Sequence, residues 1–353
     1  MKFSLFILPC YRPGIAPTLH QFYEELTETV RLADRTGWDR AWVSEHHFHY
    51  YGGASPNPAL LLQAWARETR RIRLGTGIVL LPLNHPLRTA EDYAVVDQMS
   101  GGRLDFGVGR GYLPHEFAGF NVAPDATLGK FDEALDIVTK AWSGEPFSYD
   151  GVHYKFGRLR VEPQPMQKPV PLWVACSRSK DSFEAAGRDG AGLLMNQYPM
   201  SVAQMKERFG WYKDAYAAAG HDPQKRNAMM AMFLNIADSE EQAIEEAKLG
   251  VQEHANLFRL LFGGDQWNTD YVGDESVFRF LQPDGDVTSL FRERTLVGTV
   301  DQICERIAFY RDQGYSEMSF IVRYGTLPHS KALDNIDRVN RLIRPRFQAK
   351  AAA

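Results

Sequence analysis

The alternation of short apolar segments with amphipathic helical patterns is the feature that most constrains this chain of 353 residues. Eight such segments recur, and most of them lack a polar face, which is typical of parallel strands covered on both sides. The expected strands are Lys2–Leu8, Arg40–Ser44, Ile72–Leu81, Arg103–Val108, Val170–Ala175, Gly192–Asn196, Met229–Ala237 and Ser316–Val322. Eight is the strand number of the closed βα barrel.

A helical pattern follows most of these strands. Leu19–Thr36 carries apolar residues at every third or fourth position and ends before Gly37, a residue that stops helices. The other expected helices are Pro58–Thr69, Pro86–Met99, Leu128–Trp142, Lys180–Gly187 and Lys331–Leu342. We therefore predict an α/β fold, a (β/α)8 TIM barrel in a single domain over residues 1–353. A doubly wound open sheet has the same alternation and remains the alternative.

Two segments interrupt the repeat. Phe147–Phe156 alternates in polarity around an Asp-Gly turn, which predicts a small hairpin before strand five. Ser239–Gly298 is a long insertion after strand seven that begins as a helix and continues as a stretch rich in glycine, aspartate and aromatic residues. Long loops of that kind are typical of lids or disordered segments. We expect its second part, Gly263–Gly298, to be a lid.

Composition excludes several classes of protein. The net charge is −4 and the 40 basic residues are scattered, so no nucleic-acid partner is indicated. No apolar stretch is long enough to span a bilayer, and Lys2–Leu8 is too short for a signal peptide. The three cysteines are far apart and odd in number, which argues against a disulfide framework. We expect a cytoplasmic protein without a membrane partner.

Polar residues collect directly after the expected strands. In a closed parallel barrel the active site lies on the loops at the carboxyl ends of the strands. Five successive loops carry polar clusters, namely Glu45-His46-His47, Asn84-His85, Arg110, Ser177-Arg178-Ser179 and Asn196-Gln197. The sequence therefore predicts one polar rim.

The histidines of the second loop allow a metal site, an acid–base site or a solvated loop. Adjacent residues that leave a strand point to opposite sides, so His46 and His47 are poorly placed to share one ion. No suitable set of acidic, cysteine and histidine partners follows strands one, five, six and eight. A metal-dependent barrel hydrolase remains a weaker alternative.

Two further segments are suited to an anion. "FGVGRG", Phe106–Gly111, lacks the spacing of a dinucleotide fingerprint, but its glycines admit a flat ligand and Arg110 can meet a phosphate. "ACSRSKDS" opens a helix, where backbone N–H groups and the Ser177 hydroxyl would bind an anion. Helix capping alone also explains these serines.

Four stretches together resemble the bacterial luciferase-like flavin monooxygenases, in particular their alkanal-monooxygenase branch. They are "EHHF", "GTGIVLLPLNHPLRTAEDYAVVDQMSGGRLDFGVGRG", "VACSRS" and "LVGTVDQICERI". The resemblance runs from Met1 to about Ile343, and Gly75–Gly111 is its most specific part. It implies an eight-stranded βα barrel, usually dimeric, with FMN in the open end and its phosphate outward.

The resemblance also assigns residues. His46 matches the family's acid–base histidine, with Glu45 and His47 flanking it, and Glu116 falls where the catalytic luciferase subunit has an acidic residue that affects flavin chemistry. The matched positions for the cofactor are Phe6, a cis peptide between Gly77 and Ile78, Gly109, Arg110, Cys176 and Ser177.

Two departures from the luciferases concern the ring pocket. Gly109 replaces a reactive cysteine, which enlarges the pocket beside the ring and argues against light emission. The luciferase tryptophan after strand six is replaced around Gln197.

The function implied is oxygenation of an apolar organic substrate, such as an aldehyde or ketone, by reduced FMN and O2 through a flavin hydroperoxide. No dinucleotide site is visible, so we expect a separate flavin reductase as partner. Expected pocket walls are Phe6, Tyr50, Tyr51, Tyr112 and Phe117.

We expect a homodimer, or a heterodimer with a related chain, through the helices after strands two and three, because Pro58–Trp65 is apolar on more than one face. Deazaflavin-dependent hydride transfer and a non-catalytic flavin-binding subunit are further alternatives.

Overall fold

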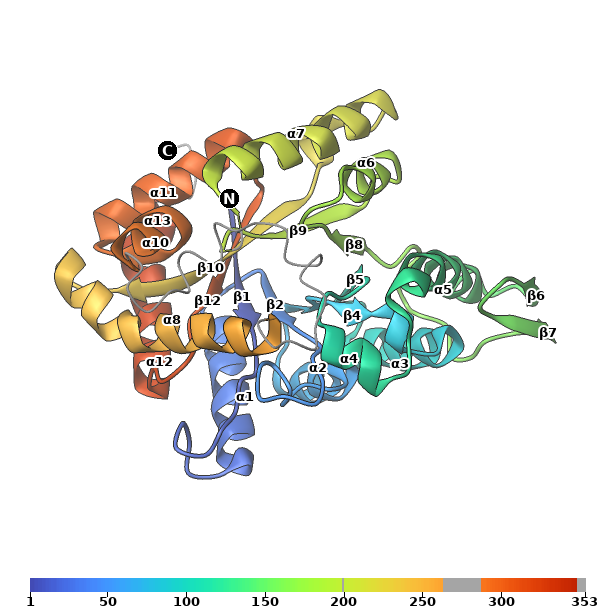
Figure 1. The fold of residues 1–353 in the computed structure, drawn as a ribbon, viewed down its shortest axis with the longest axis horizontal. Helices are drawn as coiled ribbons and strands as arrows, with labels where there is room; N and C mark the ends of the chain where they lie inside the picture. The colour runs from blue at the N-terminus through green and yellow to red at the C-terminus, as the bar shows by residue number, and fades with distance from the viewer. Residues whose placement is uncertain (199, 263–286, 348–353) are drawn as a thin grey trace.

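The computed structural model describes residues 1–198, 200–262 and 287–347, and its strands close into a parallel barrel (Figure 1). Neighbouring strands pair in the order β10-β12-β1-β2-β3-β5-β8-β9, and β9 pairs with β10 to close the ring. The barrel strands are β1 (Lys2–Ile7), β2 (Arg40–Val43), β3 (Arg73–Thr76), β5 (Leu104–Gly109), β8 (Leu172–Ala175), β9 (Gly192–Asn196), β10 (Ala228–Ile236) and β12 (Glu317–Ile321). This confirms the TIM barrel over the open sheet.

Helices surround the ring of strands (Figure 1). They are α1 (Leu19–Arg35), α2 (Pro58–Glu68), α3 (Pro86–Ser100), α4 (Pro114–Gly119), α5 (Thr127–Ala141), α6 (Lys180–Arg188), α7 (Val202–Ala218), α8 (Glu240–Phe262), α10 (Val287–Arg294), α11 (Val300–Gln313), α12 (His329–Arg338) and α13 (Arg344–Phe347). A π-helical turn, Val339–Ile343, joins the last two, and short 3-10 turns lie at Leu81–Leu83, Pro124–Ala126 and Pro223–Lys225. None of these helices, within the described ranges, is long and apolar enough to cross a bilayer.

One expected strand is wrong as drawn. Ile72–Leu81 is not continuous, because the chain leaves β3 at a cis peptide bond between Gly77 and Ile78 and resumes as β4 (Val79–Leu80). Two long helices, α7 and α11, are absent from the expected set although each begins with a capping box, at Ser201–Gln204 and Thr299–Gln302.

Both insertions are recognisable. The predicted hairpin is formed by β6 (Phe147–Asp150) and β7 (Lys155–Leu159), which pair antiparallel. The long insertion contributes α8, α10 and β11 (Leu296–Gly298), and β11 pairs parallel with β10 outside the closed ring. Most of the expected lid, residues 263–286, lies outside the described residues.

Two tryptophans fill the middle of the barrel. Trp42 and Trp173 meet edge to face with ring centroids 5.1 Å apart, and both are buried. A side chain at Gly75 would collide with the Trp42 ring, and one at Gly192 would collide with the Trp173 ring. These inward glycines therefore provide the space that the indole rings occupy.

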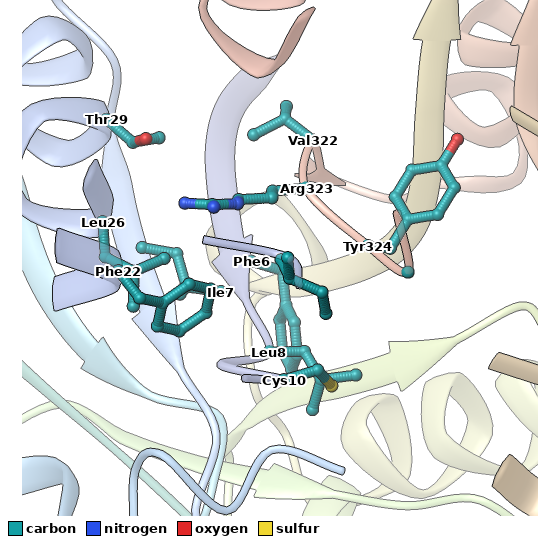
Figure 2. A pocket seen from close by; sticks show the side chains of 12 residues that line it. Phe6, Ile7, Leu8, Cys10, Phe22, Leu26, Thr29, Val322, Arg323 and Tyr324 are labelled. Carbon is teal, nitrogen blue, oxygen red and sulfur yellow. The ribbon is translucent and has the colours of Figure 1, made fainter. Parts of the chain in front are cut away.

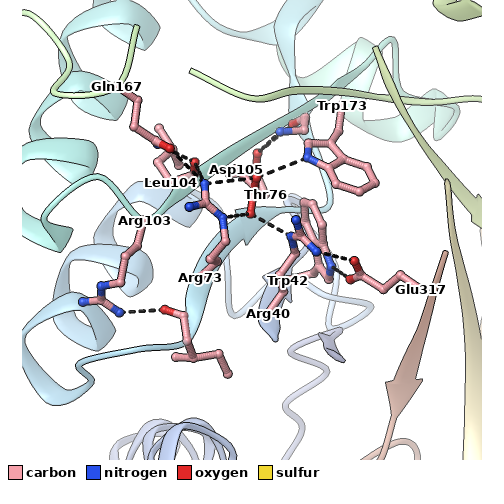
Figure 3. A network of polar contacts seen from close by, with 12 residues as sticks. Arg40, Trp42, Arg73, Thr76, Arg103, Leu104, Asp105, Gln167, Trp173 and Glu317 are labelled. Atoms are coloured by element: carbon pink, nitrogen blue, oxygen red, sulfur yellow. Dashed lines mark hydrogen bonds and ion pairs between the residues drawn. The ribbon is translucent and has the colours of Figure 1, made fainter. Parts of the chain in front are cut away.

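Below the tryptophans, a buried network of charges closes the amino end of the barrel (Figure 3). Arg40 donates from Nε to Asp105 Oδ2 at 2.8 Å and from Nη1 to Glu317 Oε2 at 2.5 Å. Arg73 Nε lies 2.7 Å from the same Asp105 oxygen. Burial opposes the charge on Arg40, but Glu317 and Asp105 outweigh it and raise the pKa of Arg40. Because this end is filled, only the carboxyl end of the barrel is open to a ligand.

Replacing Asp105 by asparagine should destabilise the protein strongly, because the buried Arg40 and the half-buried Arg73 would lose the carboxylate that they share. We expect the Asp105→Asn variant to lose about 3–5 kcal/mol of unfolding free energy in urea denaturation. Asp136→Asn is the control, since Asp136 pairs with Lys140 at the surface and should cost less than about 0.5 kcal/mol. Equal losses in the two variants would contradict the role given to this network.

Candidate active site

The loop after β2 and helix α4 meet at the carboxyl end of the barrel and bring three of the predicted residues together. His46 Nδ1 lies 3.0 Å from Glu116 Oε1, and the backbone N–H of His47 donates to the same oxygen at 2.9 Å. His46 is 7% exposed and Glu116 is fully buried. Residues 70 positions apart in the sequence thus form one buried acid–base pair.

This contact fixes how the His46 ring is protonated. Glu116 Oε1 already accepts the N–H of His47, so His46 Nδ1 is the donor toward it. The remaining ring nitrogen, Nε2, is then an acceptor in the neutral imidazole, and it makes no hydrogen bond with any described residue. Glu116 Oε2 is buried and likewise lacks a hydrogen-bond partner within the described ranges. His46 therefore offers a basic nitrogen while its other face is held by a carboxylate.

Glu45 and His47 form a second pair that points away from the first. His47 Nε2 lies 3.1 Å from Glu45 Oε1, and Glu45 also accepts from the Leu80 backbone N–H at 3.1 Å and from the Asn84 side chain at 2.8 Å. Glu45 therefore ties the loop after β2 to β4 and the turn that follows it. The two adjacent histidines do face opposite sides, as the sequence predicts.

Aromatic side chains enclose His46. The Tyr51 ring lies 4.8 Å from the imidazole and the Tyr112 ring 6.1 Å, and the two tyrosine hydroxyls are 3.2 Å apart. Burial raises the pKa of both tyrosines, so they stay neutral. Of the other expected walls, Tyr50 stacks on His49 and Phe117 is buried, so Tyr51 and Tyr112 form the immediate surroundings of His46.

The inner surface of the barrel mouth is built by β1, β3 and β5. The cis peptide between Gly77 and Ile78 is present, as the family resemblance implies. The Phe6 ring lies 2.7 Å from the position that a Cβ on Gly77 would take, so only glycine fits beside it. A Cβ on Gly109 would collide with Ile78 Cδ1. The expectation that Gly109 enlarges the pocket is therefore wrong, because Ile78 fills that space.

An anion-binding end lies where β5 and β8 finish. Arg110 is half-buried, makes no hydrogen bond or ion pair with the described residues, and acts electrostatically on the Cys176 thiol. Ser177 is exposed, with a hydroxyl free of described partners. Ser179 at the start of α6 makes no side-chain cap, so capping does not account for this serine.

The Cys176 side chain is buried in the protein interior. Its thiol lies 3.4 Å from the carbonyl oxygen of Ser182 and its N–H donates to Leu194. Burial raises the pKa of this thiol to about 12, although Arg110 acts against the shift. Arg110 and Ser177 therefore remain as the groups that can meet a ligand anion.

The residues present are suited to a flavin. A phosphate would meet Arg110 and the N-terminus of α6, and a flat ring would meet Phe6 and the cis peptide between Gly77 and Ile78. In contrast, the described part of the chain contains no group of three or more histidine, cysteine, aspartate or glutamate side chains placed to hold a metal ion.

Sequence reasoning missed His254, which reaches this end of the barrel from α8. Its ring packs on Tyr51 at 5.4 Å, on Tyr198 at 5.2 Å and on Phe233 at 4.7 Å. Burial, and to a smaller degree His46, lowers the pKa of His254 to about 3. A lone histidine in an amphipathic helix carries no motif, so only the fold reveals its position.

Known proteins are similar to this chain in sequence and in fold. The sequence model of a family described as "Luciferase-like monooxygenase" matches residues 1–317, which confirms the resemblance inferred from the sequence. The flavin-dependent trigonelline monooxygenase, oxygenase component, of Acinetobacter baylyi is 28% identical, with 98% of this chain and 96% of that protein covered.

Solved structures give the same result. The monooxygenase RslO1 from Streptomyces bottropensis superimposes with a TM-score of 0.87 at 29% identity, covering 99% of this chain and all of that one. An F420-dependent secondary alcohol dehydrogenase superimposes with a TM-score of 0.75, covering 99% of each chain. At 17% identity, it shows similarity of fold alone.

The buried His254 should make the protein less stable in mild acid. In the folded protein it stays neutral because its pKa is about 3, whereas in the unfolded chain it takes a proton once the pH falls below about 6.5. His254 therefore costs no stability above a pH of about 6.5, and the unfolding free energy decreases as the pH falls from there toward 3. Between pH 7.5 and 5.5 the wild type should lose about 1.4 kcal/mol of unfolding free energy through this residue. Chemical denaturation at both pH values should show that His254→Gln lacks this loss; the same slope in both proteins would contradict it.

Proposed function

Because this chain belongs to the luciferase-like monooxygenase family, we propose that it is a two-component monooxygenase that uses reduced FMN and O2 to oxygenate a small organic substrate. The observation that carries this proposal is the buried pair of His46 and Glu116, which leaves Nε2 of His46 as a basic nitrogen at the open end of the barrel. Reduced flavin, when bound, supplies the electrons that activate oxygen.

The phosphate of FMN would be held by Arg110 and the Ser177 turn, since Arg110 makes no ion pair with any described residue. Its ring would lie against Phe6 and the cis bond between Gly77 and Ile78. We take FMN rather than a deazaflavin because the relative similar over almost the full length is flavin-dependent, whereas the F420 enzyme shares only the fold.

His46 would hold or return the proton that decides whether activated oxygen reaches the substrate or escapes as peroxide. Glu116 is a positioning residue in this proposal: it fixes the ring through Nδ1 and stabilises the imidazolium when Nε2 takes a proton. Glu45 is bonded to Leu80, Asn84 and His47, so we assign it to holding the loop rather than to touching substrate.

The surroundings of His46 favour an apolar reacting group. Tyr51 and Tyr112 remain neutral and cover part of the His46 ring. Excluding water limits the stray proton transfer that would waste reduced flavin. A separate flavin reductase is the partner we propose, since the similar protein from Acinetobacter is named as the oxygenase component of its enzyme.

We also propose a dimer through α2 and α3. Leu60 on α2 is 63% exposed, although the same helix buries Leu62 and Trp65 against the barrel. An apolar residue on the outer face of this helix supports a second contact there.

Arg110→Ala should weaken FMN binding by about 1.5–3 kcal/mol, because a charge-assisted contact with the phosphate is lost. Fluorescence titration with FMN measures this change. Arg158→Ala on the exposed hairpin is the matched control and should leave the affinity unaltered. Equal affinity in all three proteins would mean that the phosphate lies elsewhere.

His46→Ala should separate flavin oxidation from product formation. We expect it to bind FMN normally but to form product roughly 10²–10⁴-fold more slowly, the usual effect of a lost acid or base. The electrons should then appear as hydrogen peroxide. The assay supplies reduced FMN and measures hydrogen peroxide together with oxygen uptake. His47→Ala is the control, since its ring faces Glu45 and Phe120 instead. Unaltered coupling in His46→Ala would make that histidine structural.

A further inference from the structure

We propose that Arg323 binds a carboxylate group on the substrate, so that the substrate is an apolar organic acid. This inference rests on the proposed function and deepens it by naming the class of substrate. A cavity lies at the open end of the barrel, between the end of β1, helix α1 and the turn that follows β12 (Figure 2). The residues that line it include Phe6, Leu8, Phe22, Leu26 and Arg323.

The Arg323 guanidinium is buried with donors to spare. Its side chain is 8% exposed, and Figure 2 shows it extending from the turn after β12 across the cavity toward α1. It forms an ion pair with Glu25 through Nη2 and lies over the Phe22 ring, 4.6 Å from the centroid. Nε and Nη1 have no hydrogen-bond partner within the described residues. The Glu25 carboxylate therefore occupies only part of the guanidinium, and Arg323 lines the cavity with two of its nitrogens unpaired.

The chemistry of this cavity selects the ligand. A guanidinium binds carboxylates strongly because its planar array of N–H donors matches their oxygens. Buried donors without acceptors cost free energy, which an incoming carboxylate would recover. The cavity has a volume of about 20 Å³, which is room for a carboxylate group and not for a whole ring. The other walls, Phe6, Leu8, Phe22 and Leu26, are apolar, so an apolar body is favoured next to the bound carboxylate.

Side chains that line the cavity also contact the candidate active site. Phe6 lines it and also lies against Gly77 at the cis peptide. A second, adjoining cavity shares Leu8, Cys10 and Tyr324 and extends to His254. His254 packs on Tyr51, which packs on His46. A molecule anchored at Arg323 would therefore extend along Phe6 toward the acid–base pair.

The test compares benzoate with benzamide, which has the same shape but no charge, by isothermal titration calorimetry in the absence of flavin. We expect benzoate to bind wild type and benzamide to bind at least about tenfold more weakly. Arg323→Met should weaken benzoate binding by roughly 10- to 100-fold. Glu25→Gln should strengthen it, because the internal competitor for the guanidinium is removed. Arg31→Met, which breaks a surface ion pair on the same helix, is the control and should have no effect.

Equal binding of benzoate and benzamide, or no binding of either, would overturn the proposal. Circular dichroism shows whether Arg323→Met folds. If it does not, the Glu25→Gln variant tests the proposal, because no gain in benzoate affinity is expected from that variant if Arg323 has only a structural role. FMN titration of the wild type separates the two proposals. Binding of FMN without binding of benzoate refutes the carboxylate site alone, whereas failure to bind FMN refutes the proposed function.

Discussion

The buried ion pairs at the amino end of the barrel are the constraint on which the rest of the structure depends. Arg40, Asp105 and Glu317 come from three different strands, and each is buried. Their hydrogen bonds extend to the Trp42 and Trp173 indoles, at 2.9 Å to Glu317 and 3.3 Å to Asp105. A shift of one strand by one residue would turn its charge out of the network and leave the partners buried and unpaired. The network therefore holds the strands in register and closes one end, so chemistry is confined to the other.

The buried carboxylates at the carboxyl end of the barrel have hydrogen-bond partners of a different kind. At the amino end Asp105 and Glu317 meet arginines, which keep their charge at any accessible pH. At the carboxyl end Glu45 and Glu116 meet imidazoles, backbone N–H groups and an amide. An imidazole can donate and accept a proton whereas a guanidinium only donates hydrogen bonds, so the pairs at the open end are the ones suited to proton transfer.

The sequence predicted the ring of strands well because each strand is buried on both faces and reads as an apolar run. It failed where the outcome depends on contacts between strands. The break at Gly77–Ile78 divides a mainly apolar run, and the space beside Gly109 is taken by Ile78 from the link between β3 and β4. His254 and Arg323 belong to no motif, and their positions follow only from how α8 and the end of β12 pack. In contrast, α7 and α11 were predictable, since their capping boxes are visible in the sequence.

The order of the strands around the barrel gives the site a direction. From β12 through β1, β2 and β3 to β5, neighbouring strands lead in turn to Arg323, Phe6, His46, Gly77 and Arg110. The two arginines therefore stand at opposite ends of this arc, and the acid–base histidine follows the middle strand. Two anions bound in one low-dielectric pocket would repel each other strongly if they were close. The proposed positions, with a cofactor phosphate at one end and a substrate carboxylate at the other, would keep the charges apart, while both uncharged bodies would extend inward to the same histidine.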